Sequence, residues 1–400
     1  MKKVLEEAKN LQEQLIDYRR FLHQNPEIGM ELPVTVAYVK EELTKMGYTP
    51  EEIGQSGLVA TVGGKNPGKV ILLRADMDAL PIREEVDEEF KSENGNMHAC
   101  GHDFHTTMLL GAAKVLKEHE NEIKGTVKLM FQPGEEVLMG AKAMIDAGIL
   151  ENPKVDAAVM FHVFTGFGAP TGMVVVPSAG ASSAASDRFE IMIKGKGGHG
   201  AMPERTIDPL NVMSHIHIAL QAINSREITC TDSAVVTVGM MAGGTAPNII
   251  PDTATMKGTI RTFSEENRKF IHQRIKDIAE GIAKTFRAEA KVNIIEGCPA
   301  LVNDQSLIDS AKEALIDSFG PHMVLNMVDV IPSGKIMSSE DFSFVSHKVP
   351  SLMLAMMAGD SKNGYIYPVH HPKAKFDEDV LYKGAAAYAN IAMHWLNHNS

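Results

Sequence analysis

The spacing of apolar residues along the chain predicts its first helices and strands. Over residues 3–24, apolar side chains recur every three or four positions, which predicts an amphipathic helix. The same spacing over residues 33–46 predicts a second helix, with Pro33 in its first turn and Gly47 at its end. Residues 70–73, Val-Ile-Leu-Leu, form an unbroken apolar run. Such a run is typical of a strand buried on both faces of a sheet.

Strands and helices then alternate as far as about residue 162. Strands are predicted at residues 57–62, 70–75, 126–131 and 156–162, and helices at residues 106–118 and 141–147. Three of the strands end in His or are followed within a few residues by Asp or Glu. In an α/β sheet, ligands collect at the carboxyl ends of the strands. The pattern therefore predicts an α/β fold with a doubly wound mixed sheet and a functional site on its carboxyl edge.

The pattern changes at about residue 187, where apolar and polar residues alternate over 188–194. The elements that follow are a helix at 207–223, strands at 234–242 and 253–263, a helix at 265–286 and a strand at 288–296. This order, β-α-β-β-α-β, is that of a ferredoxin-like α+β unit. We therefore expect an inserted lid domain at residues 185–296, between two parts of a catalytic domain at 1–184 and 297–400. The second part is predicted to contain a helix at 304–319, a strand at 350–357 and a closing helix at 378–396.

Composition and charge exclude several classes of protein. A chain of 400 residues is long enough for two domains, and its net charge of −12 argues against nucleic acid as a partner. Residues 157–186 lack Asp, Glu, Lys and Arg, but their many Gly and Pro residues argue against a membrane span. The N-terminal residues turn acidic early and do not predict a signal peptide. Three irregularly spaced cysteines predict no disulfide framework, and we expect a reducing compartment, the cytoplasm.

Residues 97–107 concentrate the side chains that bind metal ions. Cys100 and His102 stand two positions apart, so in an extended segment both would leave the same side of the backbone. A thiolate beside an imidazole suits zinc, nickel, cobalt or manganese better than magnesium or calcium. The alternative is a buried cysteine beside a helix start, with Asp103 and Thr106 as caps. That alternative does not account for Cys100 and His102.

Further candidate ligands follow other predicted strands. Glu135 and Glu136 end a strand, where neighbouring side chains point to opposite sides, so one can bind metal while the other faces a water. Taken alone, such a pair is more typical of a solvated turn. His162 alone fits a core histidine equally well, and the pair at 370–371 fits a surface loop. Together they supply enough ligands for a dinuclear site.

Two further roles are predicted for this site. Cys100 is the candidate bridging ligand between the ions. Asp78, which follows the buried strand at 70–75, suits the role of accepting an N–H from a ligating imidazole. His98 and His105 receive no predicted role.

Seven segments resemble, in order, the amidohydrolase branch of the aminoacylase and carboxypeptidase family. They are residues 74–81, 97–107, 132–136, 196–199, 247–248, 258–261 and 370–373. Members of this branch include hippurate hydrolase, N-acetyl-diaminopimelate deacetylase and the plant auxin-conjugate hydrolases. Two departures are visible: Phe104 stands where a small residue is usual, and Gly200 where alanine or serine is common.

The resemblance implies a dinuclear metal centre and assigns its residues. Two divalent transition-metal ions, manganese, zinc, nickel or cobalt, are expected to be bound by Cys100, His102, Glu136, His162 and His370. Glu135 is the expected general base, and His199 is expected to stabilise the developing oxyanion. Asn248 and Arg261 are expected to bind the carboxylate of the substrate.

The implied function is hydrolysis of the amide bond of N-acyl amino acids, with an acetyl, benzoyl or similar acyl group. A dipeptidase or carboxypeptidase of the same family is the alternative within the enzyme class. A metal-binding protein that has lost catalysis is the alternative outside it, although the presence of Glu135 argues against this. The expected partner is the small-molecule substrate, with no nucleic acid and no membrane. A homodimer or homotetramer through the inserted domain is also expected.

Overall fold

The structure is a computed structural model and describes residues 2–399. It divides into two compact units. Unit 1 comprises residues 1–182, 302–334 and 341–400, and unit 2 comprises residues 183–301 and 335–340. The boundaries expected from the sequence differ from these by a few residues, and the expectation also left the short segment 335–340 in the catalytic domain. This segment belongs to unit 2, where Ala184 N donates to the carbonyl oxygens of Ile336 and Ser338 at 3.2 and 3.0 Å.

Unit 1 is built on an eight-stranded mixed sheet. In spatial order its strands are β1 (Glu51–Ile53), β2 (Gly57–Gly63), β4 (Lys124–Gln132), β3 (Asn66–Asp76), β5 (Ala157–Phe164), β16 (Ser351–Met357), β6 (Val174–Val176) and β15 (Val324–Asn326). The four central strands are parallel, whereas β2 and β6 pair antiparallel with their central neighbours. The carboxyl ends of the central strands therefore meet at one edge.

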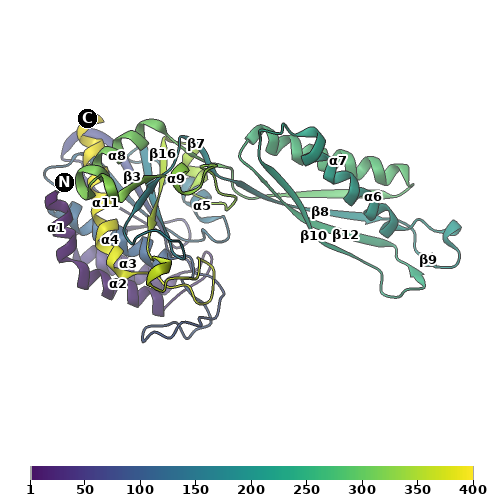
Figure 1. Ribbon diagram of the computed structural model, residues 1–400, viewed down its shortest axis with the longest axis horizontal. Helices are drawn as coiled ribbons and strands as arrows, with labels where there is room; N and C mark the ends of the chain where they lie inside the picture. Colours follow the sequence, from purple (N-terminus) through teal and green to yellow (C-terminus); the bar gives the residue numbers. More distant parts are fainter. Residues whose placement is uncertain (1, 400) are drawn as a thin grey trace. The chain divides into compact units, whose positions relative to one another are not determined.

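Helices cover both faces of this sheet. On one face lie α1 (Lys2–Asn10), α2 (Gln12–Gln24), α3 (Pro33–Lys45), α4 (His102–Glu118), α8 (Gln305–Phe319) and α11 (Leu381–Asn399). Figure 1 shows α1, α2, α4 and α11 side by side, and their apolar faces form one core with the inward side chains of the sheet. The single helix predicted at residues 3–24 is two helices separated at Leu11, and the helix predicted from residue 106 begins at His102.

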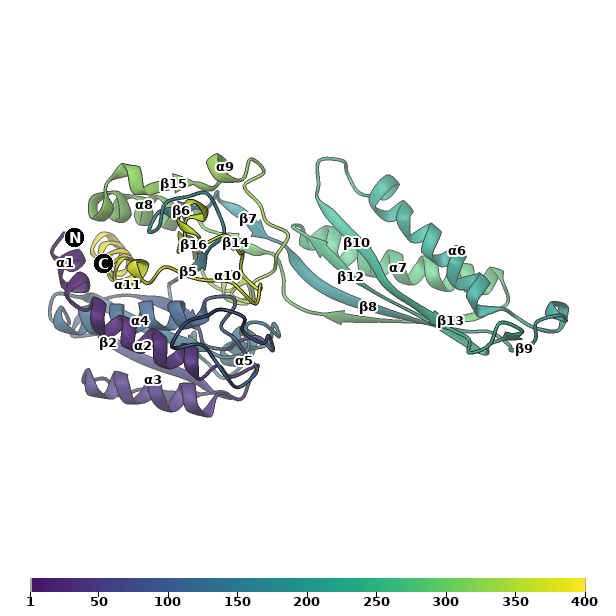
Figure 2. The same ribbon diagram turned by 60° about the horizontal axis from the view of Figure 1, so that its bottom comes forward.

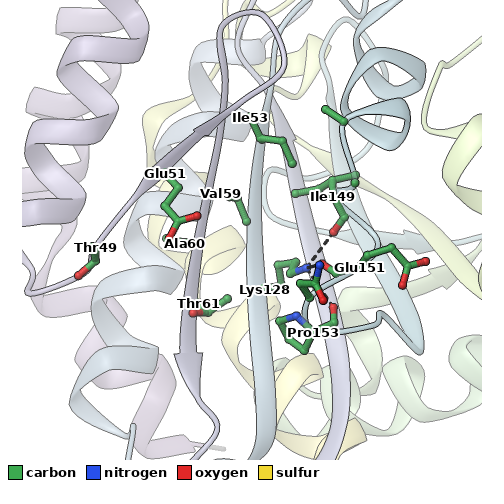
Figure 3. A pocket seen from close by; sticks show the side chains of 13 residues that line it. Thr49, Glu51, Ile53, Val59, Ala60, Thr61, Lys128, Ile149, Glu151 and Pro153 are labelled. Atoms are coloured by element: carbon green, nitrogen blue, oxygen red, sulfur yellow. Dashed lines mark hydrogen bonds between the residues drawn. The ribbon is translucent and has the colours of Figure 1, made fainter.

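The opposite face carries α5 (Gly140–Asp146) and α10 (Ser343–Ser346). A cavity of about 300 Å³ lies beside β2 and β4, next to the buried side chain of Lys128 (Figure 3). The Lys128 ammonium donates to the carbonyl oxygens of Ile149, Glu151 and Pro153 at 2.9, 2.7 and 3.0 Å. An ammonium has three protons to donate, so this one is fully used by the fold. We therefore assign the cavity a structural role and no ligand-binding role.

Unit 2 contains a four-stranded antiparallel sheet with the spatial order β10-β12-β8-β13. Its elements are β8 (Ala185–Lys194), α6 (Pro209–Ala222), β10 (Ala234–Gly243), β12 (Thr253–Thr262), α7 (Glu265–Thr285) and β13 (Glu289–Glu296). Both helices pack on one face (Figure 2), where Phe189, Ile191 and Ile193 of β8 are fully buried. The predicted ferredoxin-like unit is confirmed.

Four further short strands and one short helix are not predicted by the apolar pattern. They are β7 (Gly180–Ser183), β9 (Gly198–His199), β11 (Ile249–Ile250), β14 (Leu301–Asn303) and α9 (Met327–Val330). Among residues 2–399, no helix has the length and apolarity needed to cross a membrane.

Candidate metal centre

The turn into α4 places the first two candidate ligands. Gly101 has φ 91°, and a Cβ at this position would lie 2.4 Å from Val163 Cγ2, so only glycine fits. His102 is the first residue of the helix. The expected extended conformation is therefore wrong, because a left-handed glycine separates Cys100 from a helical His102. Both side chains are buried, with exposed fractions of 6% and 1%.

The other four candidate ligands converge around Cys100. His162 Nε2 lies 3.5 Å and His370 Nε2 3.1 Å from Cys100 Sγ, and His370 Nε2 lies 3.4 Å from a Glu136 carboxylate oxygen. Ligand atoms of Cys100, His102 and His162 form one group within 4.8 Å, and those of Cys100, Glu136 and His370 form another. Cys100 belongs to both groups, as a bridging ligand would.

The imidazole rings are oriented by backbone carbonyl groups. His102 Nδ1 donates to Asp78 O at 2.8 Å, and His162 Nδ1 donates to Val163 O at 2.7 Å. In the neutral form of each ring the proton is therefore on Nδ1, and Nε2 is left as a lone-pair donor for a metal ion. Within the described part of the chain, the buried atoms His102 Nε2 and Glu136 Oε1 have no hydrogen-bond partner. This set of thiol, imidazole and carboxylate groups fits divalent transition-metal ions.

The electrostatics of the site favour an added positive charge. Burial alone would lower the pKa of His102, but Asp76 and Cys100 hold it well above its usual value. Burial, together with Asp78, raises the pKa of Glu136 to about 7. Burial lowers the pKa of His162, so this ring stays neutral and able to bind a metal ion. The site therefore attracts a cation, either a proton or a metal ion.

Asp78 is at the site, but its carboxylate has a different partner from the one expected. Its two oxygens accept the backbone N–H groups of Glu135 and Glu136 at 3.0 and 3.1 Å. The carboxylate is 3.5 Å from His102 Nδ1, whereas the Asp78 carbonyl oxygen is 2.8 Å away. The imidazole is thus oriented mainly by the main chain of Asp78. The carboxylate instead holds the turn that carries the two glutamates.

Glu135 is buried beside Glu136, with an exposed fraction of 6%. One of its carboxylate oxygens lies 3.4 Å from the backbone N of Asp341. Asp341 in turn accepts the backbone N–H of Ala141 at 2.9 Å, at the start of α5. The loop that carries Glu135 is thereby fixed at both ends.

Of the two adjacent histidines in the last loop, the structure brings His370 to the site. His370 adopts φ 64°, a conformation that costs a non-glycine residue about 1–3 kcal/mol, and its N–H donates to Ala99 O at 2.8 Å. His371 instead stacks on Tyr367 with ring centroids 4.3 Å apart. The strained backbone is what turns His370 rather than His371 toward Cys100.

Asp76 and His105 also reach this site, although no role was predicted for His105. His105 Nδ1 lies 2.6 Å from one oxygen of Asp76, and Arg74 donates to the other at 2.6 Å. Burial alone would raise the pKa of Asp76, but Arg74, His102 and His105 hold it well below its usual range. Two signals were available in the sequence. Asp76 ends a buried strand, and His105 stands one helical turn after His102.

The other polar residues of the segment belong to the scaffold. One oxygen of Asp103 accepts from Arg19 Nε at 2.9 Å and His23 Nδ1 at 2.8 Å, while the other accepts the first-turn N–H of Phe104 at 3.0 Å. Thr106 donates to Asp76 O at 2.7 Å instead of capping the helix. Phe104 is fully buried in the core of unit 1. The unusual residue of the motif therefore packs the helix against the core.

Unit 2 holds three further candidate residues in two places. His199 and Asn248 are exposed neighbours at the β9–β11 pair, where Gly200 N donates to Asn248 O at 2.9 Å. His199 Nδ1 accepts the N–H of Ala201 at 3.0 Å, so its Nε2–H is free to donate. Arg261 is partly buried near the end of β12, and burial lowers its pKa.

These two places lie near opposite ends of the sheet. Arg261 pairs with Ser186 near the start of β8, whereas His199 follows Lys194 at the end of that strand. The eight steps from Ser186 to Lys194 span about 26 Å. Figure 1 labels β9 at the end of unit 2 where His199 lies. One unit therefore cannot place all three side chains on one small substrate.

Fold and site together define a class of two-unit α/β proteins with a candidate dinuclear metal centre at the carboxyl edge of the larger sheet. A family model described as "Peptidase family M20/M25/M40" matches residues 72–394. The chain belongs to this family.

Relatives and solved structures match nearly the whole chain. It is 40% identical over 402 residues to IAA-amino acid hydrolase ILR1-like 2 of Arabidopsis thaliana, covering 98% of this chain and 88% of that protein. It is 37% identical over 391 residues to N-acetyl-L-cysteine deacetylase of Bacillus subtilis, covering 97% and 90%. The crystal structure of Bacillus subtilis YXEP, described as a dinuclear metal-binding peptidase from the M20 family, matches with a TM-score of 0.82 and 32% identity, covering 97% and 99%.

Proposed function

We propose that this protein is a dinuclear metal-dependent amidohydrolase that cleaves N-acyl amino acids to a carboxylate and a free amino acid. The observation that carries the proposal is the convergence of two ligand groups on Cys100, next to the buried Glu135. The names of the relatives support the substrate class, since one is named an IAA-amino acid hydrolase and another an N-acetyl-L-cysteine deacetylase.

The centre would hold two divalent ions, of manganese, zinc, nickel or cobalt. The residues that would bind them are Cys100, His102, Glu136, His162 and His370. When bound, such ions polarise the amide carbonyl and lower the pKa of a water molecule toward neutrality.

The protein's own groups would move the proton and hold the substrate. Glu135 takes a proton from the attacking water and delivers it to the nitrogen of the leaving amine. Asp78 fixes the turn on which Glu135 stands, through its two backbone N–H contacts. His199 Nε2–H donates to the oxyanion of the tetrahedral intermediate. Asn248 and Arg261 bind the carboxylate of the amino-acid half, for which a guanidinium is suited by its paired donors.

The distance within unit 2 supports a homo-oligomer. Because about 26 Å of β8 separates Arg261 from the end where His199 and Asn248 lie, one small substrate can meet all three only if two protomers contribute. We propose a homodimer or homotetramer through this unit, in which His199 of one protomer serves the metal centre of another. We also propose a reducing compartment, the cytoplasm, because all three cysteines are free thiols and Cys100 must stay reduced to bind metal.

A substrate panel tests the activity. Chelator-treated protein is reloaded with manganese, zinc, nickel or cobalt and assayed on N-acetyl amino acids, N-benzoyl amino acids and dipeptides. We expect metal-dependent release of the amino acid from the acylated substrates. Faster turnover of dipeptides with a free amino group would identify a dipeptidase or carboxypeptidase instead. Full activity without metal, or none with any of the four metals, would contradict the proposal.

A further inference from the structure

His105 is a fully buried side chain that the proposed reaction does not use. Its Nδ1 is 2.6 Å from an oxygen of Asp76, and its Nε2 accepts the backbone N–H of Val163 at 2.8 Å. A backbone N–H can only donate, so Nε2 carries no proton. The proton of the neutral ring is therefore on Nδ1 and is donated to Asp76.

Val163 connects this ring to a candidate metal ligand. The carbonyl oxygen of Val163 accepts Nδ1–H of His162 at 2.7 Å, while its N–H is bound by His105. His162 Nε2 is thereby turned toward Cys100 Sγ, 3.5 Å away. A continuous chain of hydrogen bonds runs from Asp76 through His105 and the Val163 backbone to His162.

The sheet needs side-chain acceptors at this place. Among the described residues, β3 and β5 pair only as far as Arg74, so the next outward N–H groups of β5 have no strand partner on that side. Tyr388 Oη accepts the N–H of Phe161 at 2.9 Å, and His105 accepts that of Val163. The two acceptors differ in consequence, because only the second holds the main chain of Val163, the residue whose carbonyl oxygen orients a candidate ligand.

We propose that His105 is a positioning residue of the metal centre. By holding the N–H of Val163, which belongs to the peptide group between His162 and Val163, it keeps His162 in the orientation that binds metal, and Asp76 keeps the ring proton on Nδ1. The proposal rests on the metal centre of the proposed function. Partners that orient a ligating histidine typically change metal affinity by about 10- to 100-fold.

Two substitutions separate the two contacts of the ring. In His105→Asn the short amide keeps a donor near Asp76 but does not reach the N–H of Val163. In His105→Gln the longer side chain returns an acceptor to that N–H. His98→Gln is the matched control, since His98 is an equally buried histidine of the same segment whose ring nitrogens have no hydrogen-bond partner among the described residues.

The test is a titration of chelator-treated, full-length protein with zinc by calorimetry and with cobalt by visible absorption. We expect two ions per chain for the parent. His105→Asn should lower the affinity for one ion by about 10- to 100-fold and shift the cobalt spectrum, while the other ion binds nearly as before. His105→Gln should recover most of the affinity, and the His98→Gln control should bind like the parent.

The outcomes distinguish the two proposals. A folded His105→Asn variant that binds both ions as the parent does overturns the role of His105 alone. Two-ion binding that depends on His105, without amide hydrolysis, overturns only the proposed function. A parent that binds no transition-metal ion overturns both.

A measurement on the parent needs no variant to fold. In nitrogen-15 histidine NMR spectra we expect His105 as the Nδ1–H tautomer with and without zinc. An Nε2–H tautomer would contradict the geometry on which the proposal depends.

Discussion

The metal centre of unit 1 and the candidate residues of unit 2 are held in different ways. At the carboxyl edge of the large sheet, His102 and His162 are buried, and each ring is fixed by a backbone carbonyl at 2.8 or 2.7 Å. In unit 2, His199 and Asn248 are exposed on a short two-stranded pair. Groups that the fold already holds in place need no rearrangement, and so cost no free energy of reorganisation, when the reaction occurs. Exposed groups become ordered only when they contact a partner. The candidate ligands of unit 1 are therefore preorganised by the fold, whereas His199 and Asn248 of unit 2 are not.

The strongest test of this contrast is Glu135→Gln. The amide keeps the size of the side chain but cannot take a proton from water, so we expect kcat to fall by about 10²- to 10⁴-fold. Metal content, measured by elemental analysis, should stay at the parent level. A variant with nearly full turnover and bound metal would show that Glu135 is not the base.

The next test asks whether the second unit acts across protomers. We expect His199→Ala to lower kcat by about 10²- to 10³-fold, as for the loss of one oxyanion donor. Mixing it with Glu135→Gln under conditions that exchange subunits should then restore up to about a quarter of the parent activity, because half of the random dimers contain one intact site. Activity that stays at the level of the separate variants would place His199 and Glu135 of one chain at the same site.

Arg261→Ala tests recognition without chemistry. Loss of a charge-assisted contact to the substrate carboxylate should raise KM by about 10- to 100-fold, with a smaller change in kcat. The control is a substrate whose carboxylate is converted to a neutral amide, for which parent and variant should differ little. An unchanged KM for carboxylated substrates would remove Arg261 from the binding site.

The smallest expected effect is on the free energy of unfolding. The contribution of His23 in unit 1 and that of Asp187 in unit 2 should depend on pH in opposite directions. Burial and Arg19 oppose protonation of His23, yet hydrogen bonds to Asp103 and Glu84 raise its pKa above the usual value. The folded state thus holds this proton more tightly than the unfolded chain. Its stabilisation is complete below the unfolded pKa of about 6.5 and is lost as the pH rises through the folded value.

In unit 2 the sign is reversed. Burial alone would raise the pKa of Asp187, but Arg268 and His272 hold it well below the usual range. Its stabilisation is present above the unfolded pKa of about 3.9 and is lost as the pH falls. The measurement is the free energy of unfolding in denaturant from pH 3 to 9. His23→Gln should lower this free energy by about 1–3 kcal/mol near pH 6 and by less at pH 9. In Asp187→Asn the free energy of unfolding should fall less steeply than in the parent as the pH is lowered toward 3. Equal losses at every pH would contradict both assignments.

Much of the fold could be predicted because its elements bury one continuous apolar face. The run at residues 70–73 and the alternation at residues 188–194 identified a central strand of each sheet. The break at Leu11 and the start of α4 at His102 were missed, because apolar spacing continues across the first and Gly101 determines the second. The short strands β9 and β11 have only two residues each, too few for a periodic pattern.

The sequence by itself determined which residue types are available at the carboxyl edge of the large sheet. A cysteine, histidines and glutamates end the strands or follow them, and parallel strands bring such ends together. Tertiary structure alone decided how each is used. It turned His370 rather than His371 toward Cys100, and it placed the Asp78 carboxylate against the turn that carries the two glutamates. It also connected His105 to a candidate ligand through the main chain of Val163. These choices depend on hydrogen bonds between segments far apart in the chain, which spacing along the sequence does not encode.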